Sequence, residues 1–319
     1  MKRIGVLTSG GDAPGMNAAI RAVVRTAIYH GFEVMGVERG YHGLLDNMMF
    51  PMNSRSVSEI LQRGGTILKT ARCEAFNSEE GIQRAVEVIK SRGIDSMVII
   101  GGDGSFRGAR DLDDAGIPTI AIPGTIDNDL GYTDLTIGFD TAITTVMESV
   151  SKLRDTSSSH ERMFVVEVMG RNCGDIALFA GIISGAEEVI VPEMPFSVKE
   201  VAERVNIGVD GGKSHYIILV AEGAVDPYAF TEELEELTKI NTRLAVIGHL
   251  QRGGSPTATD RLLATRMGAR AVEELRIGNS GVAIGLKGNV LTTKSIDEAL
   301  AVRDRLSMEL YRLAEILAR

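Results

Sequence analysis

The feature that most constrains the fold is a recurring pair of segments: a short apolar run that ends at glycine, followed by a helix-like stretch. Residues 3–8 form the first apolar run, and the turn Ser9 to Gly15 joins it to a helical pattern over 16–30. Apolar residues in that pattern recur at the spacing of an amphipathic helix. Parallel strands need crossover connections, and these are usually helices. The alternation therefore predicts an α/β fold of mostly parallel sheet.

The alternation continues along the chain. Strands are expected at 33–38, 96–101, 119–122, 163–168, near 188–191, 215–221, 243–248 and 281–286. Helices are expected near 55–62 and at 79–92, 105–115, 139–153, 174–184, 197–208, 258–276 and from 295 onward. The segments around Tyr41 and from Asp155 to Glu161 are expected to be loops. We expect two αβα layers, with a boundary near 138–155.

Composition excludes several classes of protein. A chain of 319 residues has length for about two domains or one large α/β unit. A net charge of −9 disfavours nonspecific nucleic-acid binding, and no apolar run approaches a membrane span. Cys73 and Cys173 form no disulfide framework, and the chain enters a strand without a signal peptide. We expect a cytoplasmic protein that binds neither nucleic acid nor membrane.

Polar loops follow three of the predicted strands. Gly10 and Gly11 precede a helix, Gly101 to Ser105 follow the strand at 96–101, and Pro123 to Asp129 follow the strand at 119–122. Loops at the carboxyl ends of strands are where α/β sheets bind ligands. Free N–H groups at a helix start suit phosphate, and a carboxylate beside them suits Mg²⁺. These loops therefore predict a phosphate site along one sheet edge.

Each of these features has a simpler explanation on its own. The loop with Asp127 and Asp129 could be a solvated acidic turn, although two close carboxylates repel unless a cation, a donor or a proton transfer holds them. Asp103 could be a helix N-cap. A Walker P-loop is disfavoured because Met16 stands where its lysine belongs, and the dinucleotide pattern fails at Arg107.

Five arginines lie in or beside loops, several next to glycine: Arg72, Arg162, Arg171, Arg243 and Arg252. Guanidinium groups bind phosphate in bidentate fashion. Singly, each could be a solvated surface residue, and His249 could be structural. Together, the loops and the arginines predict Mg²⁺-dependent phosphoryl transfer to a phosphorylated acceptor, with Asp127 as the base.

Five longer motifs run from Leu7 to Asn17, Ile100 to Ser105, Pro123 to Asp129, Met169 to Arg171, and Gly248 to Pro256. They resemble the motifs of bacterial ATP-dependent 6-phosphofructokinases. The resemblance implies transfer of the ATP γ-phosphoryl group to the 1-hydroxyl of fructose 6-phosphate, giving fructose 1,6-bisphosphate and ADP in glycolysis. It also implies Mg²⁺ as cofactor and a homotetramer with active sites shared between subunits. The implied domains are 1–138 plus about 252–301 for ATP, and about 139–251 plus 302–319 for the sugar phosphate.

The resemblance also implies roles for single residues. Asp127 would be the base, and Thr125 and Arg171 would contact the transferring phosphoryl group. Arg72 would bridge the phosphates, Gly11 would complete the catalytic set, and Asp103 and Asp129 would hold Mg²⁺. ATP would lie along Gly11, Tyr41, Arg72, Cys73, Phe76, Gly102, Asp103, Gly104, Ser105 and Gly108. The fructose 6-phosphate site would use Thr125, Ile126, Asp127, Met169, Gly170, Arg171, Glu222, His249, Leu250, Gln251 and Arg252, with Arg162 and Arg243 from a neighbouring subunit.

Two glycines favour ATP as the phosphoryl donor. In pyrophosphate-using relatives an aspartate stands at the position of Gly104 and a lysine at that of Gly124. Without those side chains there is room for the α-phosphate of ATP and no ammonium for pyrophosphate. The alternatives are a pyrophosphate-dependent phosphofructokinase, a lipid or NAD kinase with a similar glycine loop, and a non-catalytic nucleotide-sensing module.

The resemblance further implies an effector site between subunits, where ADP or GDP activates and phosphoenolpyruvate inhibits. The matching positions are Arg21, Arg25, Ser54, Glu59, Arg154, Gly185, Glu187, Gly211, Lys213 and His215. Ser54 and Gly211 stand where relatives usually have basic residues. Since each charge-assisted hydrogen bond contributes ~1.5–3 kcal/mol, we expect weaker effector binding.

Overall fold

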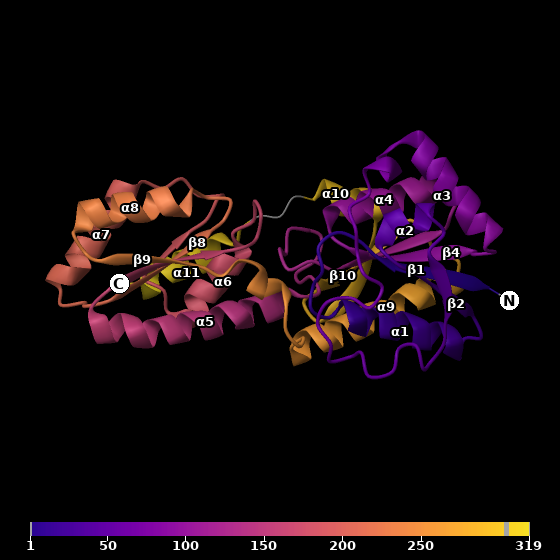
Figure 1. The fold of residues 1–319 in the computed structure, drawn as a ribbon, viewed down its shortest axis with the longest axis horizontal. Coiled ribbons are helices and arrows are strands. Elements are labelled where there is room, and N and C mark those ends of the chain that lie inside the picture. The colour runs from indigo at the N-terminus through magenta and orange to yellow at the C-terminus, as the bar shows by residue number, and fades with distance from the viewer. Residues whose placement is uncertain (1, 303–305, 319) are drawn as a thin grey trace. The chain divides into compact units, whose positions relative to one another are not determined.

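The computed structural model describes residues 2–302 and 306–318, and the chain divides into two compact units (Figure 1). Within the described residues, unit 1 comprises 2–126, 130–141 and 252–302. Unit 2 comprises 127–129, 142–251 and 306–318. The chain thus passes between the units several times, and residues 127–129 belong to unit 2 although unit 1 flanks them on both sides.

Unit 1 is built on a seven-stranded sheet in the order β11-β10-β5-β4-β1-β2-β3. Its strands are β1 (Arg3–Thr8), β2 (Glu33–Val37), β3 (Met49–Met52), β4 (Ser96–Gly101), β5 (Thr119–Pro123), β10 (Val282–Lys287) and β11 (Val290–Ser295). The five inner strands pair in parallel, and the edge strands β3 and β11 pair antiparallel. Every residue of β4 and β5 is buried, which explains why these strands read as continuous apolar runs.

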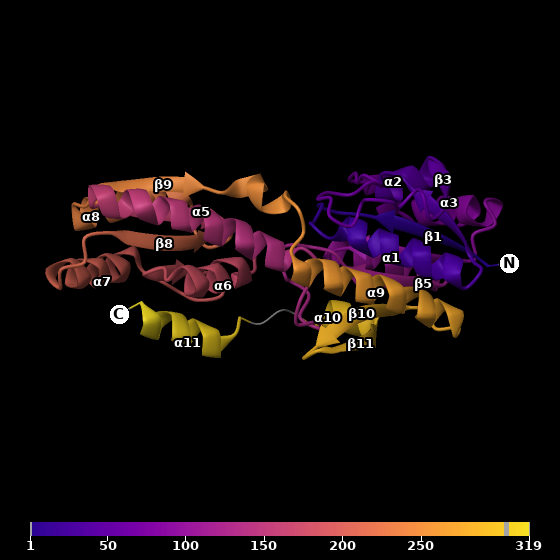
Figure 2. The same ribbon diagram turned by 90° about the horizontal axis from the view of Figure 1, so that it is seen from below.

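Helices cover both faces of this sheet. They are α1 (Met16–Tyr29), α2 (Gly40–Leu45), α3 (Glu79–Ser91), α4 (Asp103–Asp114), α9 (Ala258–Arg276) and α10 (Ile296–Ala301), with the 3₁₀ turn η1 (Glu74–Asn77). Helices α1 and α9 pack against each other (Figure 2). A separate core cluster joins Phe106 of α4 and Ile89 of α3 to Leu7 and Ile99 of the sheet.

Unit 2 has a four-stranded parallel sheet in the order β7-β8-β6-β9. Its strands are β6 (Met163–Val168), β7 (Glu188–Ile190), β8 (Tyr216–Ala221) and β9 (Thr242–Val246). Its helices are α5 (Phe139–His160), which begins in unit 1, α6 (Asp175–Ser184), α7 (Val198–Asp210), α8 (Pro227–Thr238), α11 (Met308–Leu317) and the 3₁₀ turn η2 (Gly248–Arg252). Its core includes Val205 of α7, Phe230 of α8 and Ile218 of β8.

The predicted α/β class with two mostly parallel sheets is confirmed. The prediction of a helix near 55–62 is wrong, because the Asn53 side chain accepts hydrogen bonds from the N–H groups of Arg55 and Ser56 and holds a turn. The segment around Tyr41 is helical rather than a loop, since it lies in α2.

The predicted loop from Asp155 to Glu161 is also wrong, because α5 continues to His160. Its serines stay within the helix by bonding back one turn: Ser151 donates to the carbonyl of Met147 at 2.8 Å, and Ser159 to that of Asp155 at 2.8 Å. The elements missed from sequence are β3, α8 and β11. Among the described residues, no helix is both long and apolar enough to cross a bilayer.

Candidate active site

Three loops of unit 1 lie side by side because the strands that they follow are neighbours. Strand β4 pairs in parallel with β1 on one side and with β5 on the other. The N–H of Ser9 donates to the carbonyl of Ile100 at 3.0 Å, and the N–H of Gly124 donates to that of Gly101 at 3.0 Å. The glycine turn after β1, the start of α4 and the segment that begins at Gly124 therefore share one sheet edge, where α/β folds bind ligands.

The glycine turn after β1 presents bare backbone to an arginine. Gly10 and Gly15 have φ angles of 83° and 105°, a region that favours glycine. A Cβ atom at Gly11 would lie 2.4 Å from Nη1 of Arg252. That same Nη1 donates to the carbonyl of Asp12 at 3.2 Å. The predicted ATP residue Gly11 and the predicted sugar-phosphate residue Arg252 are therefore neighbours within unit 1.

The first turn of α4 carries the predicted metal ligand Asp103. Gly102 is the N-cap and Asp103 the first helical residue, so the alternative that Asp103 caps the helix is wrong. Oδ2 of Asp103 accepts from Nη2 of Arg107, one turn on, at 2.9 Å. The Ser105 hydroxyl is buried and has no hydrogen-bond partner among the residues that the structure describes. Since an unpaired buried hydroxyl is unfavourable, Ser105 is available to a bound group.

An aromatic wall beside α4 gathers four of the predicted nucleotide residues. Tyr41 and Phe76 stack with 4.1 Å between ring centroids, and the Tyr41 hydroxyl donates to the carbonyl of Ser105 at 2.6 Å. A Cβ atom at Gly108 would lie 2.5 Å from Cζ of Tyr41. Burial, and after it the charge of Asp111, raises the pKa of Tyr41 well above its usual value, so its hydroxyl stays a donor.

The loop before this wall carries Arg72 and Cys73. The hydroxyl of Thr70 donates to the carbonyl of Gly10 at 2.7 Å, which holds the loop against the glycine turn. Arg72 is exposed, and Cys73 is half-buried against the core cluster that includes Tyr41 and Phe76. The cation of Arg72 is therefore accessible to an anion that approaches this part of unit 1.

The two glycines that bear on the phosphoryl donor differ in their surroundings. A Cβ atom at Gly104 would meet nothing within 4 Å. A Cβ atom at Gly124 would lie 2.9 Å from Cγ2 of Ile100 and 3.3 Å from Cε of Met16. A longer side chain at position 124 would force the core beneath the loop to repack. Packing therefore favours glycine at this position, in addition to the predicted preference for ATP as phosphoryl donor.

In unit 2, the acidic turn is fixed by a hydrogen bond to the start of α6. Asp127 is 3% exposed. Asn128 adopts a φ of 53°, and its Nδ2 donates to Oδ2 of Asp175 at 2.8 Å. Asp175 is itself buried in the first turn of α6. Packing rather than solvent therefore sets the position of the Asp127 carboxylate.

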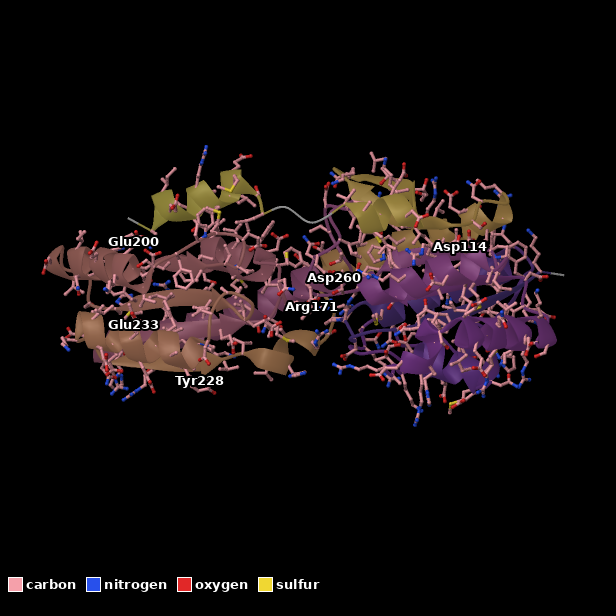
Figure 3. The ribbon with its side chains drawn as sticks, turned by 90° about the horizontal axis from the view of Figure 1, so that it is seen from above. Asp114, Arg171, Glu200, Tyr228, Glu233 and Asp260 are labelled. Atoms are coloured by element: carbon pink, nitrogen blue, oxygen red, sulfur yellow. The ribbon has the colours of Figure 1, made fainter. Side chains whose placement is uncertain are left out.

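Arg171, which is labelled in Figure 3, contacts the same turn through its side chain. Its N–H donates to Oε1 of Glu222 at 2.8 Å, and its Nη1 lies 3.5 Å from Oδ2 of Asp129. The Arg171 side chain is 61% exposed. Gly170 precedes it with a φ of 138°, where a Cβ atom would lie 2.4 Å from the carbonyl oxygen of Cys173. Because an exposed ion pair contributes little, the guanidinium is able to engage an anion.

Gln251 joins two of the predicted sugar-phosphate loops. Its side chain is fully buried, Oε1 accepts from the N–H of Met169 at 3.3 Å, and Nε2 donates to the carbonyl of Gly248 at 3.1 Å. His249 and Leu250 are exposed on η2. Gln251 therefore positions the loops, whereas His249 is accessible to a ligand.

Arg162 and Arg243 lie near the amino-terminal ends of two neighbouring strands of the unit 2 sheet. Arg162 immediately precedes β6, and Arg243 is the second residue of β9, paired with Phe164. Arg171 follows the other end of β6, about 20 Å away at ~3.3 Å per residue. The structure therefore does not bring these two arginines to the Arg171 loop of their own unit.

The predicted effector residues fall into two sets. Unit 1 carries Arg21 and Arg25 on α1 and the exposed Ser54 and Glu59. In unit 2, Nη2 of Arg154 donates to the carbonyls of Ser184 at 3.0 Å and Gly185 at 2.6 Å. Nη1 of Arg154 lies 3.4 Å from Oε1 of Glu187. Three predicted effector residues of unit 2 are thus in contact.

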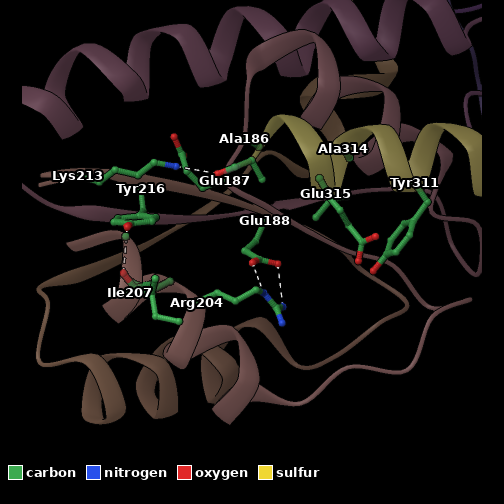
Figure 4. Close-up of a pocket in the computed structure, with 14 residues that line it drawn as sticks. Ala186, Glu187, Glu188, Arg204, Ile207, Lys213, Tyr216, Tyr311, Ala314 and Glu315 are labelled. Atoms are coloured by element: carbon green, nitrogen blue, oxygen red, sulfur yellow. Dashed lines mark hydrogen bonds and ion pairs between the residues drawn. The ribbon is translucent and has the colours of Figure 1, made fainter. Parts of the chain in front are cut away.

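Glu187 and Lys213 also line a cavity of about 580 Å³ between β7, α7 and α11 (Figure 4). Nζ of Lys213 donates to the carbonyl of Ala318 at 2.7 Å. Gly211 is the C-cap of α7 and lies in the sequence between Gly208 and Lys213, which line the cavity. Nδ1 of His215 is buried and, in the described ranges, lacks a hydrogen-bond partner.

A buried carboxylate that sequence reasoning missed lies in the first turn of α9 (Figure 3). Asp260 is 1% exposed. It accepts from the N–H groups of Gly138 and Thr141, each at 2.8 Å, and from the Thr141 hydroxyl at 2.6 Å. Burial raises the pKa of Asp260 to about 6. The only signal for it in the sequence is the spacing from Thr257, which caps α9 on the N–H of Asp260 at 3.2 Å.

The carboxylates of Asp103 and Asp129 suit a metal ion that binds together with a phosphate ligand better than one held by the protein alone. Within the described chain, no group of three or more His, Cys, Asp or Glu side chains could hold a metal ion. Mg²⁺ commonly takes one or two carboxylates together with phosphate oxygens and water. Asp103 and Asp129 supply donors of that kind.

Comparisons with known proteins agree on one family. A family model described as Phosphofructokinase matches residues 3–275. An ATP-dependent 6-phosphofructokinase of Clostridium novyi is 57% identical over 318 residues, and one of Clostridium botulinum (strain Eklund 17B / Type B) is 56% identical over 320 residues; each match covers 100% of both chains. The solved structure of phosphofructokinase from Saccharomyces cerevisiae aligns with a TM-score of 0.91 at 35% identity, covering 98% of this chain and 50% of that one.

Proposed function

The chain belongs to the phosphofructokinase family and acts as an ATP-dependent 6-phosphofructokinase, and from this premise we propose how its residues divide the reaction. The observation that carries the assignment is identity of 56% to the Clostridium botulinum enzyme across the full length of both chains. The predicted glycine turn, the start of α4 and the Gly124 loop also share one sheet edge in unit 1.

ATP binds to the phosphate-favouring edge of unit 1. Gly11 and the N-terminus of α4 offer backbone N–H groups and a helix dipole to the phosphates, and the accessible Arg72 neutralises their charge. The adenosine lies along Tyr41, Cys73 and Phe76, with Gly108 beneath. The buried hydroxyl of Ser105 supports this role, since it lacks another partner among the described residues.

The acceptor reaction depends on Asp127. Asp127 takes the proton from the sugar 1-hydroxyl as that oxygen attacks the γ-phosphorus of ATP, and ADP leaves with the electron pair of the broken P–O bond. Thr125 and Arg171 contact the transferring group and stabilise its charge. Met169 to Arg171, Glu222, His249 and Arg252 hold the sugar phosphate, with Ile126, Leu250 and Gln251 shaping its site.

Asp103 and Asp129 would each supply a carboxylate to Mg²⁺ that arrives with the nucleotide phosphates. When bound, the ion neutralises phosphate charge and so favours attack by the hydroxyl. Asp103 and Asp129 each lie beside an arginine, Arg107 and Arg171, whose exposed side chain leaves the carboxylate accessible to a cation.

The enzyme is a homotetramer that completes each active site with Arg162 and Arg243 of a neighbour. These arginines lie near the amino-terminal ends of β6 and β9, whereas Arg171 follows the carboxyl-terminal end of β6. Their separation from Arg171 within one unit supports this proposal. ADP or GDP and phosphoenolpyruvate act at the Arg154–Glu187 contact of unit 2 together with the α1 arginines of another subunit.

A coupled assay with fructose 6-phosphate, Mg²⁺ and either ATP or pyrophosphate tests the donor. We expect turnover with ATP alone, and turnover with pyrophosphate would favour the alternative enzyme. Asp127→Ser should keep fructose 6-phosphate binding, measured by calorimetry, and lower kcat by ~10²–10⁴-fold. Normal turnover of that variant would overturn the assigned base.

A further inference from the structure

Among the residues that the structure describes, the buried Asp260 carboxylate accepts its side-chain hydrogen bonds from one distant segment. Its three side-chain hydrogen bonds, at 2.6–2.8 Å, come from Gly138 and Thr141, which are 122 and 119 residues away in sequence. A buried charge is retained only where donors compensate for lost water. Here two backbone N–H groups and a hydroxyl do so, and the N-terminus of α9 adds its dipole.

A second set of bonds ties α9 to the same segment. The N–H of Thr257 donates to the Thr141 hydroxyl at 3.1 Å, and the Thr257 hydroxyl donates to Oδ2 of Asp140 at 2.5 Å. The Thr141 hydroxyl therefore accepts from Thr257 while it donates to Asp260. These hydrogen bonds together hold residues 138–141 against the start of α9.

The two residues that precede Gly138 form hydrogen bonds with the loop that carries Thr125. The hydroxyl of Thr136 donates to the carbonyl of Thr125 at 2.7 Å, and the N–H of Ile137 donates to that of Pro123 at 2.9 Å. Ile137 also forms a parallel bridge with Gly124. The Thr125 backbone is therefore supported by residues whose next neighbour, Gly138, is bonded to Asp260.

The glycine turn after β1 packs against residues 137 and 138 so closely that there is no room for a Cβ atom on Gly15 or Gly138. A Cβ atom at Gly138 would lie 2.7 Å from Cβ of Ala13, and one at Gly15 would lie 2.6 Å from Cγ2 of Ile137 and 3.6 Å from Cβ of Asp260. A shift of residues 137–138 would therefore move both the Thr125 loop and the turn that contains Gly11.

From these contacts, we propose that Asp260 is a positioning residue for phosphoryl transfer: through Gly138 and Thr141 it fixes the segment that supports the Thr125 loop and the glycine turn. The proposal rests on the role proposed above for Thr125. Asp260 touches neither substrate nor nucleotide in this scheme. A displacement of about 1 Å at reacting groups can cost ~10²-fold in rate, so its effect should fall on kcat.

The main test compares Asp260→Asn with a matched control, Asp113→Asn. The amide that replaces the Asp260 carboxylate would turn an N–H toward at least one of the present donors, which shifts the 138–141 segment. Asp113 also accepts a backbone N–H, that of Thr119 at 3.0 Å, in the same unit, but it lies at the far end of α4 from the loops. We expect at least a tenfold fall in kcat for Asp260→Asn, with dissociation constants of ATP and fructose 6-phosphate changed less than threefold, and kcat unchanged for Asp113→Asn.

A second pair of variants keeps the test decisive if Asp260→Asn does not fold. Thr141→Val removes the hydroxyl and should lower kcat severalfold, whereas Thr141→Ser restores the hydroxyl and should recover it. Equal kcat for Thr141→Val and Thr141→Ser, or for Asp260→Asn and the parent, would overturn the proposal. A parent chain without turnover on ATP would instead refute the proposed function, so the two failures are distinguishable.

Discussion

Substituting alanine at two glycines of one helix separates a packing role from a ligand role. Gly104 and Gly108 both lie in α4, and alanine is the better helix former at each by ~0.5–1 kcal/mol. At Gly108 the new Cβ would lie 2.5 Å from Cζ and 2.6 Å from the hydroxyl oxygen of Tyr41. At Gly104 it would meet nothing within 4 Å.

Gly108→Ala should destabilise the fold because Tyr41 has nowhere to move. The Tyr41 side chain is 5% exposed, stacked on Phe76 and bonded to the carbonyl of Ser105 at 2.6 Å. Overpacking costs ~1–3 kcal/mol and the strained hydrogen bond ~1 kcal/mol, of which helix propensity returns less than ~1 kcal/mol. We expect a net loss of about 1–3 kcal/mol in the free energy of unfolding, measured by urea denaturation, and a raised KM for ATP.

Gly104→Ala is the control on the same helix. Its stability should equal or exceed that of the parent by up to ~1 kcal/mol, since only propensity changes. Its KM for ATP should still rise, because the methyl group enters the space proposed for the α-phosphate. Unchanged stability in Gly108→Ala would refute the packing argument, and an unchanged KM in Gly104→Ala would refute the argument on the phosphoryl donor.

Three further outcomes follow from single sites. Gly124→Lys should cost ~1–3 kcal/mol in a urea titration through contact with Ile100, and should not by itself confer turnover with pyrophosphate; a stable variant that uses pyrophosphate would contradict this. Gly211→Arg should lower the activation constant for ADP in a kinetic assay, because it restores a cation near the proposed effector site, and an unchanged constant would count against weakened effector binding. Burial raises the pKa of Asp260 from 3.8 to about 6, so the folded chain binds a proton that the unfolded chain does not, and stability falls as pH rises from about 4 to 6. Lowering the pH from about 7.5 to about 5 should therefore add ~1.4 kcal/mol through this group, and Asp260→Asn should lose that increment in urea titrations at the two pH values; the same pH dependence in both proteins would exclude Asp260 as its source.

The inner strands were predictable because burial on both faces leaves a continuous apolar run, as in β4 and β8. The two edge strands of the unit 1 sheet were not. Strand β3 contains Pro51, and β11 carries the polar run Thr292 to Ser295, so neither reads as a strand without its partner. Helix α8 was missed although Asp226 caps it and Pro227 begins it, a start signal that is present in the sequence.

The loops of the candidate site were predictable because glycine and aspartate after a strand carry local meaning. Asp260 was not, because its importance comes from hydrogen-bond partners 119 and 122 residues away. The packing role of Gly124 depends in the same way on Ile100, which no local pattern reveals. Contacts between residues that are far apart in the sequence cannot be predicted from local sequence patterns.

Residues Asp127–Asp129 belong to unit 2 although unit 1 flanks them on both sides in the sequence. This limits which segments can be exchanged between members of the family. A chimaera made by swapping residues 142–251 between relatives would join the donor's Asp175 and Arg171 to the recipient's Asn128 and Asp129, which contact them here. Neither unit can therefore be exchanged as one continuous segment of the chain. Recombination within this family is expected to succeed only where the acidic turn and its partners are inherited together.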